Sequence, residues 1–204
     1  MSDVKSALDK ALERAEKLGK ATPEELAEWT HRPGGERLAA RFLKGEQVDL
    51  KAEGSKFPPS AQRMVLQAME GVLLANIDVP RTPGVKATAL RAIEGIRALK
   101  TDRKRLEPLL AGIVNTLQHY ETAGLQQRQQ AYEQLRQEFQ AQVPAAQAQA
   151  AQARSGKRGQ QGSQPIEVEA LPEFAAAWQQ VQAQFDAQYE KVLRDQKEAV
   201  RRLH

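Results

Sequence analysis

The first stretch whose residue types could bind a ligand is HRPGGERLAARFLKGE, residues 31–46. A glycine pair ahead of a helix can present backbone N–H groups to an anion, and the helix dipole adds to the attraction. Glu36 falls in the first turn of the helix expected here, where its carboxylate already complements the dipole and repels a phosphate. A phosphate-binding loop also needs Gly-Lys followed by Ser or Thr, and neither Gly-Lys dipeptide of this chain has that residue. Pro33, Gly34 and Gly35 are therefore predicted to form a structural corner.

Side chains that usually carry catalysis or metal binding are sparse. The absence of cysteine excludes disulfides, thiolate nucleophiles and Cys-ligated zinc. Histidine occurs only at 31, 119 and 204 and forms no HExxH pattern, and His119 is predicted to be a solvated or partly packed imidazole. Neither a G-x-S-x-G nor a G-x-G-x-x-G motif occurs, and the clustered glutamates are predicted to form solvated helix faces. We expect no catalytic residue, no metal ligand and no cofactor, and we favour a protein that is not an enzyme. An enzyme that uses Glu and Arg side chains in a cleft of the N-terminal domain is the third hypothesis.

Basic residues offer one alternative function, which is nucleic-acid binding. The net charge is +4, which permits an acidic partner without requiring one. Two groups of cations could contact phosphates: Arg97, Lys100, Arg103, Lys104 and Arg105, and then Arg154, Lys157 and Arg158. No aromatic residue is interleaved with them for base stacking, so ordinary solvation and helix C-terminal charge are the competing explanation.

The elements that position these residues are predicted to be helical, and residues 1–100 are assigned to a small helical domain. Its first helix carries an apolar stripe and ends near Gly19. A second, short helix begins at Thr22 and Pro23 and ends before the corner. Residues 46–59 are expected to cross the core as a loop, and the most buried helix begins at Ser60. The stripe of the first helix is Val4, Leu8, Leu12, Ala15 and Leu18.

The second half of the chain is predicted to form a long antiparallel, coiled-coil-like helical hairpin. Residues 101–143 carry a sustained apolar stripe typical of one long helix. Residues 144–170 are first rich in Ala and Gln and then have the composition of a flexible linker. Residues 171–204 resume the helical pattern. The two helices are similar in length, so we expect them to pack antiparallel at a shallow angle. The fold class is therefore all-α.

The hairpin leads to the predicted function. Two helices alone bury only one seam, so the hairpin is expected either to dock on the N-terminal domain or to associate with another chain. The favoured hypothesis is a non-enzymatic scaffold or adaptor whose partner is another protein or its own copy. The charged N-terminus and the shortness of the apolar runs favour a cytoplasmic protein that does not enter a membrane. The predicted partner-binding residues are Leu117, Tyr132, Leu135, Phe139, Trp178, Phe185 and Tyr189.

Overall fold

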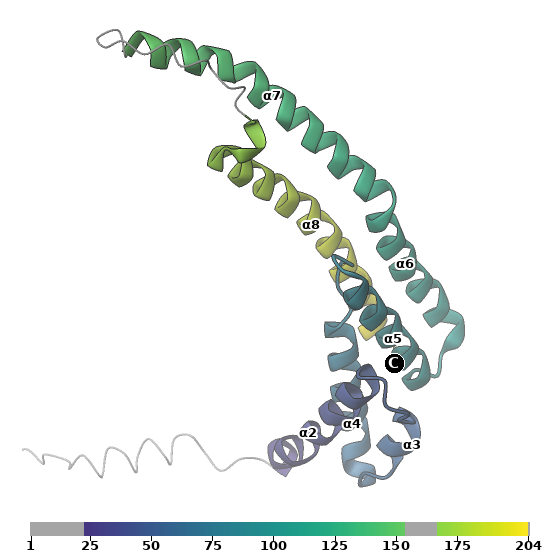
Figure 1. Cartoon of the computed structure of the whole chain (residues 1–204). Helices are drawn as coiled ribbons and strands as arrows, with labels where there is room; N and C mark the ends of the chain where they lie inside the picture. Colours follow the sequence, from purple (N-terminus) through teal and green to yellow (C-terminus); the bar gives the residue numbers. More distant parts are fainter. Residues whose placement is uncertain (1–22, 154–166, 204) are drawn as a thin grey trace, which may run out of the picture. The chain divides into compact units, whose positions relative to one another are not determined.

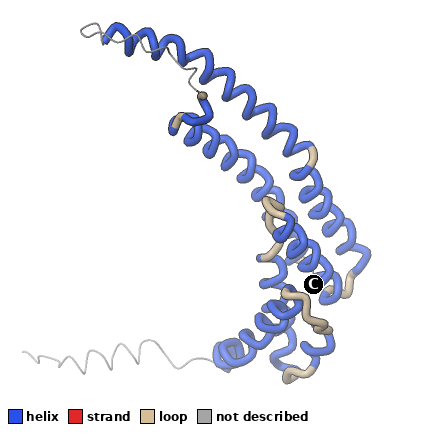
Figure 2. The backbone as a smooth tube through the Cα atoms, in the orientation of Figure 1, coloured by secondary structure: helices blue, strands red, loops and turns tan. Residues whose placement is uncertain are grey.

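The structure is a computed structural model that describes residues 23–153 and 167–203 (Figure 1). Within these residues every regular element is a helix, which confirms the all-α class (Figure 2). The predicted helix over residues 4–18 lies outside the described part. The elements are α2 (Pro23–Leu43), α3 (Leu50–Ser55), α4 (Pro59–Ala75), α5 (Pro83–Leu99), α6 (Arg103–Glu121), α7 (Ala123–Ala153), the 3-10 helix η1 (Val168–Ala170) and α8 (Pro172–Arg201).

The described residues divide into two compact units. The first contains 23–76 and 94–101, and the second contains 77–93 and the described residues from 102 onward. Residues 77–93, which the sequence analysis placed in the N-terminal domain, therefore group with the hairpin. Polar pairs at long range accompany this grouping: Arg81 and Lys86 bond to acidic residues of α8 and α6.

In the first unit, α4 is the central element and packs against α2 and α3. Val65, Met69 and Leu73 are fully buried on its inner face, as expected for the helix with the widest apolar stripe. The loop predicted for residues 46–59 instead contains the short helix α3. Asp49 caps that helix, because its carboxylate accepts hydrogen bonds from the N–H groups of Lys51 and Ala52.

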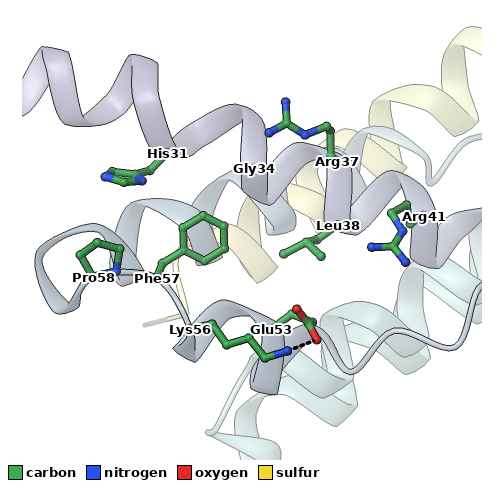
Figure 3. Close-up of a pocket in the computed structure, with 9 residues that line it drawn as sticks. All are labelled: His31, Gly34, Arg37, Leu38, Arg41, Glu53, Lys56, Phe57 and Pro58. Atoms are coloured by element: carbon green, nitrogen blue, oxygen red, sulfur yellow. Dashed lines mark hydrogen bonds and ion pairs between the residues drawn. The ribbon is translucent and has the colours of Figure 1, made fainter.

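The predicted corner at Pro33, Gly34 and Gly35 is wrong, because α2 continues through all three residues. The glycines serve close packing instead. A Cβ atom on Gly35 would lie 2.6 Å from the carbonyl oxygen of Val65, and one on Gly34 would lie 2.8 Å from the Phe57 ring. Figure 3 shows that ring directly beside Gly34. The bare glycine backbone lets α2 lie against α4, and Ala39 of α2 is fully buried.

In the second unit, α8 packs against α6, α7 and η1. The pairing is antiparallel, since Trp178 near the start of α8 meets Tyr132, whereas Gln196 near its end meets Thr116. The prediction of a single long helix over residues 101–143 is wrong in one respect. The chain breaks at Thr122 (φ −105°, ψ −89°) and forms the two helices α6 and α7.

Helix α7 also extends beyond its predicted end. It includes residues 144–153, which the sequence analysis placed in the linker, and in Figure 1 it continues past η1. Alanine has the highest helix propensity of all residues, and here it outweighs the lack of an apolar stripe. The remainder of the predicted linker up to residue 166 lies outside the described residues.

Candidate partner-binding site on the helical hairpin

Aromatic side chains close the seam between α7 and α8. The Tyr132 ring lies edge-on to Phe174 and to Trp178, with centroids 5.4 and 5.1 Å apart, and Phe139 makes the same contact with Phe174 at 5.4 Å. Such edge-to-face pairs contribute about 0.5–1.5 kcal/mol each beyond the area that they bury. Phe174 is buried, whereas Tyr132, Phe139 and Trp178 are half-buried. The cluster thus holds the helices together and still exposes part of three rings.

A second aromatic group joins α8 to the end of α6. Tyr189 lies edge-on to Tyr120 at 5.1 Å, and its hydroxyl lies 2.7 Å from His119 Nδ1. Gly124 makes this geometry possible, because a Cβ atom there would lie 2.6 Å from the Tyr189 hydroxyl. The break between α6 and α7 therefore places a bare backbone where the tyrosine needs space.

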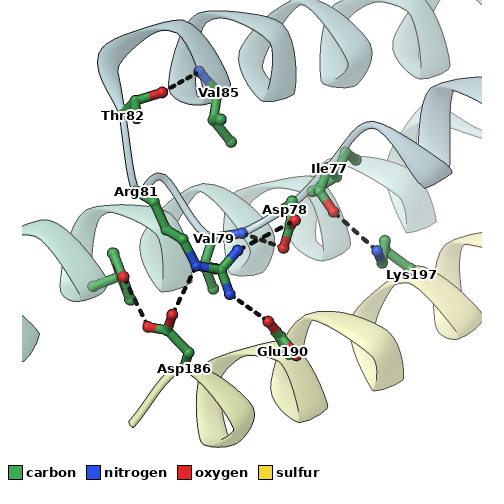
Figure 4. A network of polar contacts seen from close by, with 10 residues as sticks. Ile77, Asp78, Val79, Arg81, Thr82, Val85, Asp186, Glu190 and Lys197 are labelled. Atoms are coloured by element: carbon green, nitrogen blue, oxygen red, sulfur yellow. Dashed lines mark hydrogen bonds and ion pairs between the residues drawn. The ribbon is translucent and has the colours of Figure 1, made fainter. Parts of the chain in front are cut away.

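Arg81 is the centre of a charged network in the second unit (Figure 4). Its Nε donates to Asp186 Oδ2 at 2.7 Å, and its guanidinium also pairs with Glu190. The hydrogen bond with Asp186 raises the pKa of Arg81 above its ordinary value. Tyr120 donates its hydroxyl hydrogen to Asp186 Oδ1 at 2.8 Å, and burial, followed by this hydrogen bond, raises the pKa of Tyr120. One carboxylate therefore links the arginine to the aromatic group.

A further polar contact fixes the start of the segment that carries Arg81. Lys197 of α8 donates from Nζ to the carbonyl oxygen of Ile77 at 2.9 Å (Figure 4). Burial lowers the pKa of this ammonium below its ordinary value. Two α8 contacts, at Arg81 and at Ile77, therefore hold residues 77–81 on the hairpin.

A groove runs beside these clusters along one side of the hairpin. Two adjoining hollows, of about 580 and 520 Å³, share Leu125, Arg128 and Gln182 and so form one surface. We call it the hairpin groove. Its other lining residues are Pro80, Arg81, Tyr120, Glu121 and Asp186 in the first hollow and Gln129, Tyr132, Glu133 and Trp178 in the second.

Arg128 and Leu125 supply a charged and an apolar side chain to both hollows of the hairpin groove. The Arg128 guanidinium stacks 4.1 Å above the centre of the Tyr120 ring and donates to the Tyr120 carbonyl oxygen at 3.2 Å. Its Nη1 atom is buried and has no hydrogen-bond partner among the described residues. Leu125 is 46% exposed and lies in the same hollow as the half-buried rings of Tyr132 and Trp178.

A second hollow of about 520 Å³ lies elsewhere on the hairpin. Asn115, Thr116, His119 and Tyr189 line it together with Val192, which is 46% exposed, and with Gln127 and Gln188. It contains the His119–Tyr189 contact already described. Among the described residues, His119 and Tyr189 are the ionisable groups that line it.

The structure places the seven predicted partner-binding residues in the hairpin. Leu117 is buried, and Leu135 and Phe185 are half-buried. The ring contacts given above involve Tyr132, Phe139, Trp178 and Tyr189. These side chains therefore pack against other rings of the same chain. Only Tyr132 and Trp178 of the seven line the hairpin groove. Arg81 and Asp186 are not predictable from the sequence, because they lie 105 residues apart and no periodic pattern connects them.

The predicted basic cluster is largely occupied by ion pairs. Lys100 lies 2.8 Å from Glu70, and both side chains are about 14% exposed or less. Arg103 pairs with Glu107 at 3.7 Å and Arg105 with Asp102 at 3.6 Å. Lys104 is exposed, Arg97 is half-buried and makes its own polar contact, and Arg154, Lys157 and Arg158 lie outside the described residues.

A groove of the first unit also gathers cations (Figure 3). It measures about 440 Å³ and is lined by His31, Arg37, Arg41 and Lys56 around Phe57. The lysine pairs with Glu53 at 2.6 Å and Arg41 pairs with Glu46 at 2.6 Å. These pairs offset most of the positive charge, so the groove has no strong preference for an anion.

Residues 23–153 and 167–203 contain no group of three or more His, Cys, Asp or Glu side chains that could hold a metal ion. None of the described helices combines the length and the apolar character needed to cross a membrane.

Comparison with known proteins places the chain in one family. Residues 51–202 match the family of unknown function DUF6657, so the chain belongs to that family. The matched region covers all of α4 to α8 and therefore includes the hairpin groove. No curated protein and no solved structure matches the chain.

Proposed function

We propose that the protein is a non-enzymatic helical adaptor that binds another protein, or a second copy of itself, through the hairpin groove. The observation that supports this proposal is the exposed Leu125 beside Trp178, Tyr132 and Arg128. Tryptophan, tyrosine and arginine are the residues most enriched at the centres of protein interfaces. Polar groups such as Gln129 and Glu133 line the same groove, as expected for a rim.

The aromatic rings have two roles in this proposal. One side of each ring of the Tyr132 and Trp178 pair packs in the seam, which fixes the ring before any partner arrives. A fixed ring loses little conformational entropy on binding, so its contact area contributes more to affinity. The seam between α7 and α8 therefore fixes the two rings, and the hairpin groove presents their exposed sides to the partner.

The test compares two leucine-to-aspartate variants of the full chain. Leu125→Asp places a charge in the hairpin groove, whereas Leu90→Asp changes a leucine that is 39% exposed and lines none of the grooves described above. Loss of a central interface contact costs about 2 kcal/mol, or roughly a 30-fold weaker Kd. Self-association is followed by sedimentation velocity, and other partners by quantitative mass spectrometry of proteins that co-purify from native cells.

The expected result is that Leu125→Asp weakens self-association or the recovery of a defined partner, and that Leu90→Asp does not. Circular dichroism checks that both variants keep their helix content. If the chain stays monomeric at all concentrations and no partner distinguishes the two variants, the proposal is wrong.

Nucleic-acid binding is the second candidate, supported by the exposure of Arg103, Lys104 and Arg105 in the first turn of α6. It predicts binding that weakens steeply with salt and falls further on charge reversal at these three residues. The ratio of absorbance at 260 and 280 nm across a size-exclusion peak, at low and high salt, tests it. A peak with no 260 nm excess at either salt would exclude this candidate.

A further inference from the structure

The outer hairpin, by which we mean residues 125–142 and 168–185, leaves much of its apolar stripe half-open. It consists of α7, the first half of α8 and η1 (Figure 1). Of the large apolar side chains that α7 and α8 supply there, only Phe174 is buried. Two helices bury one narrow seam, so a stripe of this size is normally covered by further helices. The half-buried side chains are Tyr132, Leu135, Phe139, Trp178, Val181 and Phe185.

The α7 side of the hairpin groove presents one stripe of side chains along the helix. Leu125, Gln129 and Glu133 follow one another at intervals of one turn and are exposed. Arg128 and Tyr132 lie beside them and line the same hollow. Along the chain the stripe therefore runs from a leucine, through a cation and a ring, to a carboxylate. A stripe in this order has opposite charges at its two ends of the groove.

Arg128 is the cation of this stripe, and it forms no ion pair with the described residues. Its polar contacts there are with the ring and the carbonyl oxygen of Tyr120, which are both uncharged. Arg81 also lines the groove, but its guanidinium already pairs with Asp186 and Glu190. A carboxylate that enters the groove from outside therefore meets one guanidinium that is fixed in position and has no carboxylate of its own.

Glu133 is the carboxylate of the same stripe, and it is weakly held. It lies 3.5 Å from Arg136, and both of these side chains are more than 40% exposed. Arg136 has a closer partner in Glu169, at 2.6 Å. Glu133 can therefore turn to another cation while Arg136 keeps a carboxylate. The other two carboxylates that line the groove each hold a cation at 2.7 Å.

A second copy of the chain supplies both missing partners at once. Across a two-fold axis each contact occurs twice, because residue i of one copy meets residue j of the other, and j meets i. If two α7 helices lie antiparallel with the axis midway between Arg128 and Glu133, the arginine of each copy meets the glutamate of the other. Leu125 then lies against the turn that ends at Arg136 of the second copy. Any other partner needs its own match to both charges.

We propose that the hairpin groove is a self-association surface, on which the α7 helices of two copies pack antiparallel around a two-fold axis with reciprocal Arg128–Glu133 ion pairs. The α7 and α8 helices of both copies form a group of four, which covers Leu125 and the exposed sides of Tyr132 and Trp178. This inference rests on the proposed function and commits it to one occupant of the groove, a second copy of the chain.

Charge exchange in the full chain tests the pairing by sedimentation equilibrium. Arg128→Glu and Glu133→Arg each place like charges opposite one another in both contacts, so each is expected to weaken self-association about tenfold. An equimolar mixture of the two variants restores opposite charges, as does one chain with both substitutions. Both are expected to return to within about threefold of the wild-type Kd. Glu138→Arg is the control, because it makes the same charge change at an exposed position of α7 that lines neither hollow.

The outcomes separate this inference from the proposed function. Single variants that associate as tightly as the wild-type chain, or a mixture that associates no better than either variant alone, would overturn the inference. A wild-type chain that stays monomeric at all concentrations would overturn it as well. If Leu125→Asp weakens self-association or partner recovery while charge exchange has no effect, the proposed function stands and this arrangement of two copies is wrong. Circular dichroism checks that each variant keeps its helix content.

Discussion

Gly35→Ala tests the interpretation that the glycines of α2 serve close helix packing. The new Cβ atom would lie 2.6 Å from the carbonyl oxygen of Val65 and 3.2 Å from Cγ1 of the same residue. Ordinary contact begins near 3.4 Å, so α2 and α4 must separate by roughly 0.8 Å. The backbone atom cannot rotate away as a flexible side chain could. The substitution therefore disturbs the whole contact between the two helices.

Two opposing terms set the size of the effect. Replacing glycine by alanine inside a helix stabilises it by about 1 kcal/mol. Overpacking of a closely packed contact costs about 1–3 kcal/mol. The net loss is up to about 2 kcal/mol, which lowers a urea midpoint by up to roughly 1 M for a typical dependence of about 2 kcal/mol per molar urea.

Gly112→Ala is the matched control, because it makes the same change inside α6. Its Cβ atom would lie 3.4 Å from Nε2 of Gln196, which is an ordinary contact with a flexible side chain. We expect this variant to gain stability by up to about 1 kcal/mol. Urea unfolding followed by circular dichroism measures both variants, and hydrogen exchange localises the loss in Gly35→Ala to α2 and α4. If Gly35→Ala gains as much stability as Gly112→Ala, the packing interpretation is refuted.

Three further predictions concern the second unit. Arg81→Met removes both of its ion pairs with α8, and we expect faster hydrogen exchange over residues 77–93 with little change elsewhere; unchanged exchange there would contradict the holding role of the network. The raised pKa of Tyr120 means that the unfolded chain loses this proton first, so stability from this group is full below pH 10 and falls as the pH rises above it. Absorbance at 295 nm should show one tyrosine ionising above pH 10 that is missing in Tyr120→Phe. Trp178→Ala with Phe185→Ala should cost about 2 kcal/mol for each half-buried ring and should weaken any self-association, and the seam interpretation fails if neither unfolding nor sedimentation changes.

Local patterns in the sequence were enough for the fold class and for most helices. The periodic stripe from Met64 to Ala75 identified α4 as the most buried helix, because a wide apolar face has to be covered whatever its neighbours are. The stripe from Phe174 to Leu203 likewise predicted α8, and Phe174 and Val200 of this stripe are buried. In each case the signal repeats within one element and needs no knowledge of the rest of the chain.

The errors occurred where a local signal had two physical explanations. Glycine next to proline favours a turn, yet the same glycine also permits a close approach between helices, and only the position of Val65 decides between them. The apolar stripe continues through the residues around Gly124 and therefore predicts one helix. In the structure the chain breaks between α6 and α7, and Gly124 leaves the space that the Tyr189 hydroxyl needs. Sequence propensity is a weak signal that tertiary contacts regularly override.

The sequence by itself determined that the chain is helical, that cysteine chemistry is excluded, and that the rings of Tyr132, Phe139 and Trp178 lie on helical stripes. Only the tertiary structure decided which face of those rings remains open, because that depends on where Leu125 and Arg128 lie relative to α8. It also decided that Arg81 meets Asp186 across 105 residues of sequence. Periodicity describes one element at a time, whereas a groove or an ion-pair network exists only once several elements have packed together.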